Sequence, residues 1–312
     1  MEMLEKFCIS FQYKFHIECR RQSDELSGKD AMMKNRDNRT DMFLEKLKED
    51  SAEYRNLETG GWGMEEKKAA IRSLMNIRMP GRETQELLQI QDAYLKEELA
   101  AKGIVTLSGI PTVDMQYGNR APFAGKISLW QGDITRLKAG AIVNAANSQM
   151  LGCFVPCHKC IDNAIHSAAG MQLRAECGHI MEEKKMRYGR QYEEPVGRAV
   201  LTKAYNLPCE YVIHTVGPVV YGGLTDSHRR ALRSCYENVL KCCVEHDIRS
   251  VAFCCISTGE FHFPNEEAAR IAVQAVTDFL EAQGEALERV VFNVFKNCDL
   301  EIYRELLVSA DA

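Results

Sequence analysis

The stretch Ile142–Gly170 reads IVNAANSQMLGCFVPCHKCIDNAIHSAAG, and the interpretation of the remaining sequence depends on it. It begins as a short apolar strand and ends as a helix of small residues. The loop between them carries four soft ligands within eight positions: Cys153, Cys157, His158 and Cys160. Cysteine and histidine gathered on one short loop indicate a bound metal ion.

The spacing of Cys153, His158 and Cys160 allows all three side chains to reach one ion. Two thiolates and one imidazole suit zinc, which prefers such ligands in tetrahedral geometry. With three protein ligands the fourth position stays open, so the metal could act as a Lewis acid or hold a substrate oxygen. Two alternatives remain: Cys157 closes the site as a structural fourth ligand, or the thiols are simply buried without a metal.

Composition narrows the class of protein. The 312 residues suit two modest domains or one large one, and the net charge of −5 shows no basic excess for nucleic acid or acidic membranes. The thirteen cysteines are odd in number and include the adjacent pairs Cys242–Cys243 and Cys254–Cys255, unlike a disulfide framework. Charged residues near the start argue against a secretory signal, and no apolar run approaches a membrane span. We therefore expect a cytoplasmic protein.

The sequence pattern predicts a helical N-terminal extension over residues 1–117, followed by the main domain over residues 118–312. Helices are expected at Met64–Met79, before Pro80 and Gly81, and at about Thr84–Ala101, before Gly103. Residues 28–40 resemble a mobile linker. The irregular region 104–125 marks the boundary.

From Lys126 onward apolar strands alternate with helices. We expect strands in KISLWQ, AIVNAAN, GRAVLTKAYN, YVIHTVGP, SVAFCCISTG and RVVFNVF. Helices are expected at Asp226–His246 and Asn265–Leu280, with a short one ending near Leu307. This alternation predicts an α/β fold with a buried, mainly parallel sheet between layers of helices.

Four loops that leave strand ends carry small or polar residues: Gly132–Thr135, Asn144–Asn147, Leu151–Cys160 and Ser257–Gly259. Ligands of open α/β sheets bind at the carboxyl ends of the strands, where backbone N–H groups and helix N-termini attract anions. No GxxxxGK[ST] or complete GxGxxG motif is present, which excludes an ordinary P-loop or Rossmann site. The loops indicate a ligand that contains phosphate.

The motifs GDIT, IVNAAN, IDNAIHSAAG, VIHTVGP and ISTG…FP, in this order between Lys126 and Leu307, resemble the macrodomain family of ADP-ribose-binding modules. The resemblance implies a three-layer α/β/α macrodomain with a mainly parallel mixed sheet. The loop LGCFVPCHKCIDNAIH replaces the family's usual glycine-rich run. It looks like the loop of the zinc-dependent microbial subclass, which is often linked to sirtuin-type ADP-ribosyltransferases. Residues 71–104 also resemble the helical N-terminal extension of that subclass.

The resemblance implies roles for individual residues. Asp133 would accept a hydrogen bond from the adenine amino group, with Ile134 packed on the ring. Asn147 would contact the distal ribose, and Asn144 would fix the loop. Zinc would be held beside that ribose by Cys153, His158 and Cys160. Backbone groups of a further loop would wrap the phosphates and the distal ribose: Ser257, Thr258, Gly259, Glu260 and Phe261.

Several residues also allow plainer roles. Asp133 could only cap a helix, and Phe295 could stack on adenine or belong to the core. His214 is expected to be a core histidine with satisfied hydrogen bonds, and His166 could pack structurally. His262 replaces the small residue that is usual in the family and could alter the pocket wall. Gly140 replaces a frequent aspartate, and this change is expected to be neutral.

We expect a hydrolase that removes mono-ADP-ribose from modified protein side chains, with Asn147 and Asp162 as the catalytic residues and zinc as the cofactor. Asp162 could act as a general base, position a water or cap a helix. The resemblance favours linkages to Asp or Glu side chains. The alternatives are a reader that binds ADP-ribose without cleaving it, and a deacetylase of O-acetyl-ADP-ribose.

Overall fold

The computed structural model describes residues 26–308, with side chains from residue 36 onward. The chain divides into two compact units, Met1–Leu74 and Met75–Ala312, which are described separately. The division falls within helix α3 (Met64–Ile77). The domain boundary predicted between residues 117 and 118 stays a prediction.

The first unit contains helix α2 (Leu26–Asp50) and most of α3. The linker predicted over residues 28–40 is therefore wrong, because this segment lies inside α2. The signal for the helix comes later in its sequence, where Phe43, Leu44 and Leu47 are spaced to share one helical face and are all buried. Two acidic residues, Glu65 and Glu66, lie in the first turn of α3, where the helix dipole favours them.

In the second unit, helix α4 (Gln85–Lys102) confirms the helix predicted at about Thr84–Ala101. The Thr84 hydroxyl accepts a hydrogen bond from the Leu87 N–H, and Gly103 ends the helix with a φ of 78°. The region 104–125 holds only short elements, which are β1 (Val105–Thr106), the 3-10 turns η1 (Leu107–Gly109) and η2 (Ala124–Lys126), and α5 (Val113–Tyr117).

The sheet of the second unit has six strands in the order β2-β8-β7-β4-β6-β5. Neighbouring strands are parallel except for β5, which runs antiparallel to β6. Their bounds, in that order, are Ile127–Gln131, Arg289–Val294, Ser250–Phe253, Ala141–Ala146, Tyr211–Val216 and Ala199–Lys203. A separate parallel pair joins β1 to β3 (Leu137–Lys138), which follows the 3-10 turn η3 (Ile134–Arg136).

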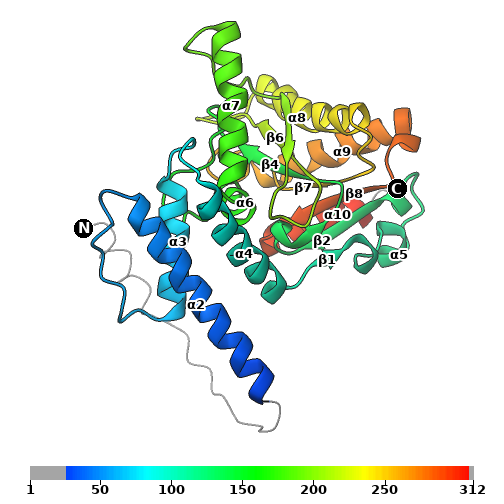
Figure 1. Cartoon of the computed structure of the whole chain (residues 1–312). Helices are drawn as coiled ribbons and strands as arrows, with labels where there is room; N and C mark the ends of the chain where they lie inside the picture. Colours follow the sequence, from blue (N-terminus) through cyan, green and yellow to red (C-terminus); the bar gives the residue numbers. More distant parts are fainter. Residues whose placement is uncertain (1–25, 309–312) are drawn as a thin grey trace. The chain divides into compact units, whose positions relative to one another are not determined.

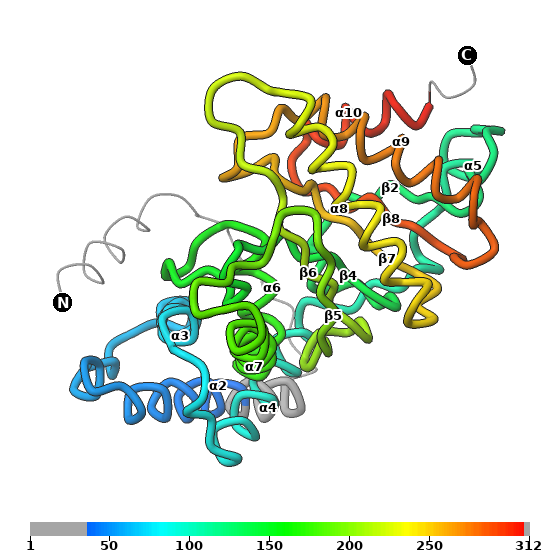
Figure 2. The backbone as a smooth tube through the Cα atoms, turned by 90° about the horizontal axis from the view of Figure 1, so that it is seen from above, coloured from blue at the N-terminus to red at the C-terminus, as the bar shows by residue number. Residues whose placement is uncertain are grey.

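Helices cover both faces of this sheet (Figures 1 and 2). On one face lie α6 (Ile161–Ala169) and α7 (Met171–Tyr188). On the other lie α8 (Asp226–Glu245), α9 (Asn265–Gln283) and α10 (Asn297–Val308). The predicted three-layer α/β/α fold with a mainly parallel mixed sheet, preceded by helices, is confirmed.

The central strands are apolar because both of their faces are covered. In β4 every residue except Ala145 is buried, and β7 ends in Phe253, which is 1% exposed. The register pairs Asn144 of β4 with His214 of β6 and so brings two polar side chains together inside the core. No helix among residues 26–308 combines the length and apolar character needed to cross a membrane.

Replacing Phe253 tests the importance of this core. Its ring packs against Tyr236 at a centroid distance of 4.9 Å. We expect Phe253→Ala to lower the free energy of unfolding by about 3–5 kcal/mol, because the substitution leaves a cavity in the central strand. Urea titration followed by circular dichroism measures the change. Met115→Ala is the control, since that side chain is 77% exposed, and an equal loss in both variants would contradict the assigned core.

Candidate metal and ligand site

The candidate site lies where β4 ends. Strand β4 stops at Ala146, and the chain passes through residues 147–160 before α6 begins at Ile161. This loop therefore lies at the carboxyl end of a central parallel strand, the edge at which α/β sheets bind ligands. The predicted strand-to-helix loop is confirmed.

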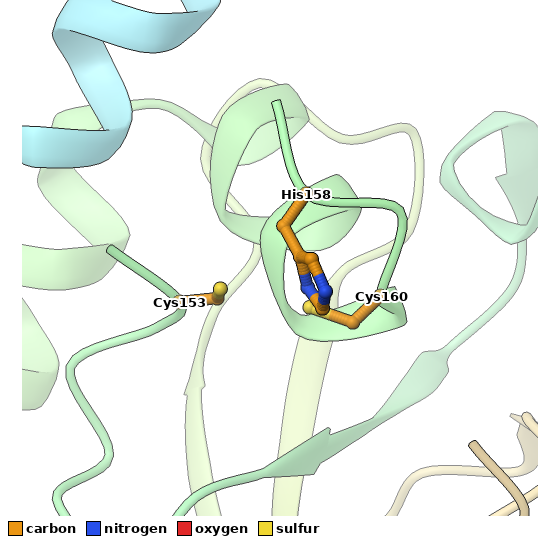
Figure 3. Close-up of side chains that lie close together, drawn as sticks. All are labelled: Cys153, His158 and Cys160. Atoms are coloured by element: carbon orange, nitrogen blue, oxygen red, sulfur yellow. The ribbon is translucent and has the colours of Figure 1, made fainter. Parts of the chain in front are cut away.

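The loop brings Cys153, His158 and Cys160 together (Figure 3). One ligand atom from each lies within 4.8 Å of the other two, and all three side chains are half-buried. Two sulfurs bound to one tetrahedral zinc ion are about 3.8 Å apart, as the zinc–sulfur bond length requires. The donor set therefore fits zinc with small side-chain movements. Cys157 lies outside this set.

Cys160 also begins helix α6. Its Sγ accepts a hydrogen bond from the Asn163 N–H at 3.4 Å, in the place of an N-cap side chain. Burial, together with the neighbouring Cys153 sulfur, raises the pKa of the Cys160 thiol to about 12. Two half-buried thiolates this close need a nearby positive charge, which a divalent ion supplies.

A buried carboxylate connects the loop to the sheet. Asp162, in the first turn of α6, is 5% exposed. Asn144 Nδ2 donates to its Oδ1 at 2.8 Å, and Asn147 Nδ2 donates to its Oδ2 at 3.3 Å. Burial raises the pKa of Asp162 to about 6, although these two amides lower it. Asn147 also donates to the Gly152 carbonyl at 3.2 Å, and it thereby fixes the residue that precedes Cys153.

His166, Cys177 and His214 form a second, fully buried group of potential ligands. Asn144 Nδ2 faces Asp162 and also lies 3.1 Å from His214 Nδ1, so Nδ1 accepts. The proton of His214 is then on Nε2, 2.9 Å from the Thr202 hydroxyl. Burial lowers the pKa of His214 to about 3. His214 is thus a core histidine with satisfied hydrogen bonds, as the sequence predicts.

His166 packs against Gly152 in the loop of residues 147–160, which we call the metal loop after its candidate ligands. It is 4% exposed, and its Nε2 lies 3.5 Å from Asp162 Oδ1. Neither ring nitrogen makes a hydrogen bond within the described part of the chain. A Cβ atom added at Gly152, where φ is 77°, would lie 2.8 Å from the His166 ring. The predicted packing role of His166 is therefore present, since its ring leaves room only for glycine before Cys153.

The second predicted loop lies against the first. Glu260 Oε1 is 3.6 Å from His158 Nε2, so the segment 257–261 borders one of the candidate metal ligands. Ser257 has a φ of 66°, and its carbonyl accepts the Phe263 N–H at 3.0 Å. Thr258 donates its hydroxyl to the Cys255 carbonyl at 3.1 Å, which shapes the turn. The expected backbone contacts of Ser257–Phe261 with phosphates stay a prediction.

At the predicted adenine end, Asp133 caps the turn η3. Its Oδ1 accepts from the Thr135 N–H at 3.0 Å and from the Thr135 hydroxyl at 2.6 Å. Asp133 Oδ2 lies 3.9 Å from Lys102 Nζ. Ile134 is 2% exposed and belongs to the core, whereas Phe295 is 78% exposed and does not. The adenine contacts predicted for Asp133 and Ile134 stay predictions.

Sequence reasoning missed Arg174 of α7. Its Nη1 donates to the carbonyls of Met75, Asn76 and Arg78 at 3.0, 2.7 and 2.7 Å. The guanidinium lies over the Phe154 ring, 4.4 Å from its centroid. Phe154 follows Cys153, so Arg174 links the metal loop to residues 75–78. No sequence motif predicts these contacts of Arg174, because the partners are backbone carbonyls about 100 positions away.

Comparison with known proteins agrees with this architecture. The profile of the Macro domain family matches residues 143–272. A protein-ADP-ribose hydrolase of Treponema medium is 47% identical over 243 residues, covering 78% of this chain and 88% of the relative. A protein-ADP-ribose hydrolase of Staphylococcus aureus strain MSSA476 is 43% identical over 235 residues, covering 75% and 82%.

Among solved structures, the Trypanosoma brucei macrodomain in complex with ADP-ribose is similar to this chain. The two share 29% sequence identity with a TM-score of 0.57, and the match covers 75% of this chain and 94% of that one.

The contact between Gly152 and His166 can be tested with a matched pair of variants. Gly152→Ala and Gly222→Ala both place alanine at positive φ, but a Cβ at Gly222 meets no atom within 4 Å. We expect Gly152→Ala to lower the free energy of unfolding by about 1–3 kcal/mol more than Gly222→Ala, because only its methyl group overpacks against the ring. Thermal unfolding compares them, and equal losses would contradict the contact.

Proposed function

The chain belongs to the macrodomain family, and on this basis we propose that it is a hydrolase that removes mono-ADP-ribose from modified proteins. The single observation that carries the proposal is the donor set Cys153, His158 and Cys160 at the carboxyl end of β4, next to Asn147. A protein that only binds ADP-ribose, without cleaving it, needs no metal-binding donor set at this edge of the sheet. The names of the relatives from Treponema medium and Staphylococcus aureus support the same activity.

The residues Cys153, His158 and Cys160 would hold zinc, with Cys157 outside the set. When bound there, zinc would supply Lewis-acid polarisation at the distal ribose. The helix N-terminus at Cys160 adds a favourable field for negative charge at the same place.

Asn147 orients the scissile end of the ligand in this proposal. Its Nδ2 is shared between the Gly152 carbonyl and Asp162, and its Oδ1 accepts the Gln149 N–H at 3.0 Å. The amide is therefore held in one orientation before a ligand arrives, which lowers the entropic cost of placing the ribose.

Asp162 acts as a positioning residue rather than as a free general base in this account. Its oxygens accept hydrogen bonds from Asn144 and Asn147, and the carboxyl group is buried beneath the loop. A general base must reach the proton that it removes, directly or through one water. Both oxygens already serve the two asparagines that shape the site.

The proposed substrates are proteins that carry ADP-ribose on Asp or Glu side chains. A sirtuin-type ADP-ribosyltransferase would attach this modification. An ester carboxylate is a better leaving group than an arginine nitrogen or a serine alkoxide. Release of label from proteins modified on Glu, Arg and Ser, measured side by side, tests the linkage. Release from the Glu-linked protein alone is expected.

Replacing a metal ligand tests the hydrolase. We expect Cys153→Ala to abolish the release of ADP-ribose, a loss of at least about 100-fold, because the polarising ion is no longer held. ADP-ribose binding, measured by calorimetry, should weaken only modestly. Cys298→Ala is the control, since Cys298 is an exposed thiol on α10.

Three outcomes would contradict the proposal. One is Cys153→Ala releasing label at the parental rate with no metal present. Another is the parent chain binding the modified protein without any loss of label over time, which would identify a reader. Acetate release from O-acetyl-ADP-ribose, without release of ADP-ribose from proteins, would identify a deacetylase.

A further inference from the structure

Asn76, near the end of α3, contacts the metal loop from outside the site described above. It is 1% exposed. Its Oδ1 accepts the backbone N–H of Cys157 at 3.0 Å, and its Nδ2 donates to Ser167 Oγ at 2.9 Å. A backbone N–H can only donate, so the orientation of this amide is determined by its partners.

Cys157 has an unusual backbone conformation for a residue with a side chain. The His158 N–H donates to the Val155 carbonyl at 3.2 Å and closes a turn with Pro156 and Cys157 at its centre. Cys157 has a φ of 52°. Proline followed by positive φ is the pattern of a type II turn, in which the second central position favours glycine. A side chain there strains the backbone, and another contact must offset that strain.

The Asn76 contact stabilises that conformation, and two further contacts hold Asn76 in place. Arg174 Nη1 donates to the Asn76 carbonyl at 2.7 Å, and Ser167, the partner of the Asn76 amide, donates to Asn163 Oδ1 at 3.3 Å. Asn163 Nδ2 in turn donates to the Val155 carbonyl at 3.0 Å, in the same turn as Cys157. The turn is thus held at both of its sides.

This conformation determines which thiols can reach the metal. His158 directly follows Cys157 and belongs to the ligand set, whereas Cys157 does not. We propose that Asn76 is a positioning residue that keeps the metal site open: by holding the Cys157 N–H, it keeps the Cys157 thiol out of the coordination sphere. The inference rests on the proposed function, since it concerns the same metal site.

Without Asn76 the turn can relax, and Cys157 can take the fourth position that the substrate needs. The site would then change from two thiolates and an imidazole to three thiolates and an imidazole, a closed set typical of structural zinc. Asn76 thus determines whether the site is open or closed, although its own side chain is not one of the candidate ligands.

Cobalt(II) substitution counts the thiolates directly. Each cobalt–thiolate bond adds to the charge-transfer absorption in the near ultraviolet, so this readout does not depend on turnover. We expect Asn76→Ala to raise the absorption per bound cobalt about 1.5-fold, the ratio of three thiolates to two in the site. The double variant Asn76→Ala/Cys157→Ser should return it to the parental value, and Cys157→Ser alone should leave it unchanged.

Milder variants keep the test decisive if Asn76→Ala does not fold. Asn76→Asp retains an acceptor for the Cys157 N–H and should keep the parental spectrum. Ser167→Ala removes one support of the Asn76 side chain and should raise the absorption in the same direction, by a smaller factor.

An unchanged spectrum in both Asn76→Ala and Ser167→Ala would overturn the inference, as would a raised spectrum that persists after Cys157→Ser. Either result leaves the hydrolase proposal standing, because the parent still binds cobalt through two thiolates. A parent chain that binds neither cobalt nor zinc would instead refute the metal site on which both proposals depend.

Discussion

The hydrogen bonds to the Asp162 carboxylate are the interaction on which the site depends. A buried carboxylate is costly unless donors surround it. Here the donors are Asn144, inside strand β4, and Asn147, directly after it, while the acceptor lies in the first turn of α6. Strand, loop and helix are therefore joined at one charged group, and the metal loop between them has little freedom. The same amide of Asn147 fixes Gly152, so this constraint reaches the residue before Cys153.

The metal loop combines ligands with a rigid frame. Small residues usually give a phosphate-binding loop its close approach to a ligand, but here the sequence from Cys153 to Cys160 contains proline, phenylalanine and three cysteines. Neighbouring side chains pack against this loop. The His166 ring packs against Gly152, and the Arg174 guanidinium lies over the Phe154 ring. A loop held in this way can present ligands without reorganising, which is the property that a catalytic metal site requires.

Much of the fold could be predicted from the sequence, because buried parallel strands are continuous apolar runs and their helices have clear caps and stops. The closeness of Cys153, His158 and Cys160 could also be predicted, because all three lie within eight positions of one loop. The helix α2 was missed: residues 28–40 are mostly polar, and the buried apolar residues Phe43 and Leu47, which share one helical face, come after them. Arg174 and Asn76 were missed because backbone groups far away in the chain are their partners.

The sequence by itself determined the α/β class, the order of its loops and the gathering of four candidate ligands on one loop, since all of these depend on local periodicity and spacing. The register of β4 against β6 placed Asn144 beside His214, and the packing of α6 placed Asn144 beside Asp162; no local pattern contains either contact. Tertiary structure alone decided the place of Cys157. Four candidate ligands share one short stretch of chain, and spacing cannot separate them. The backbone turn at Cys157, held by Asn76, excludes one thiol from the set and leaves the other three side chains together.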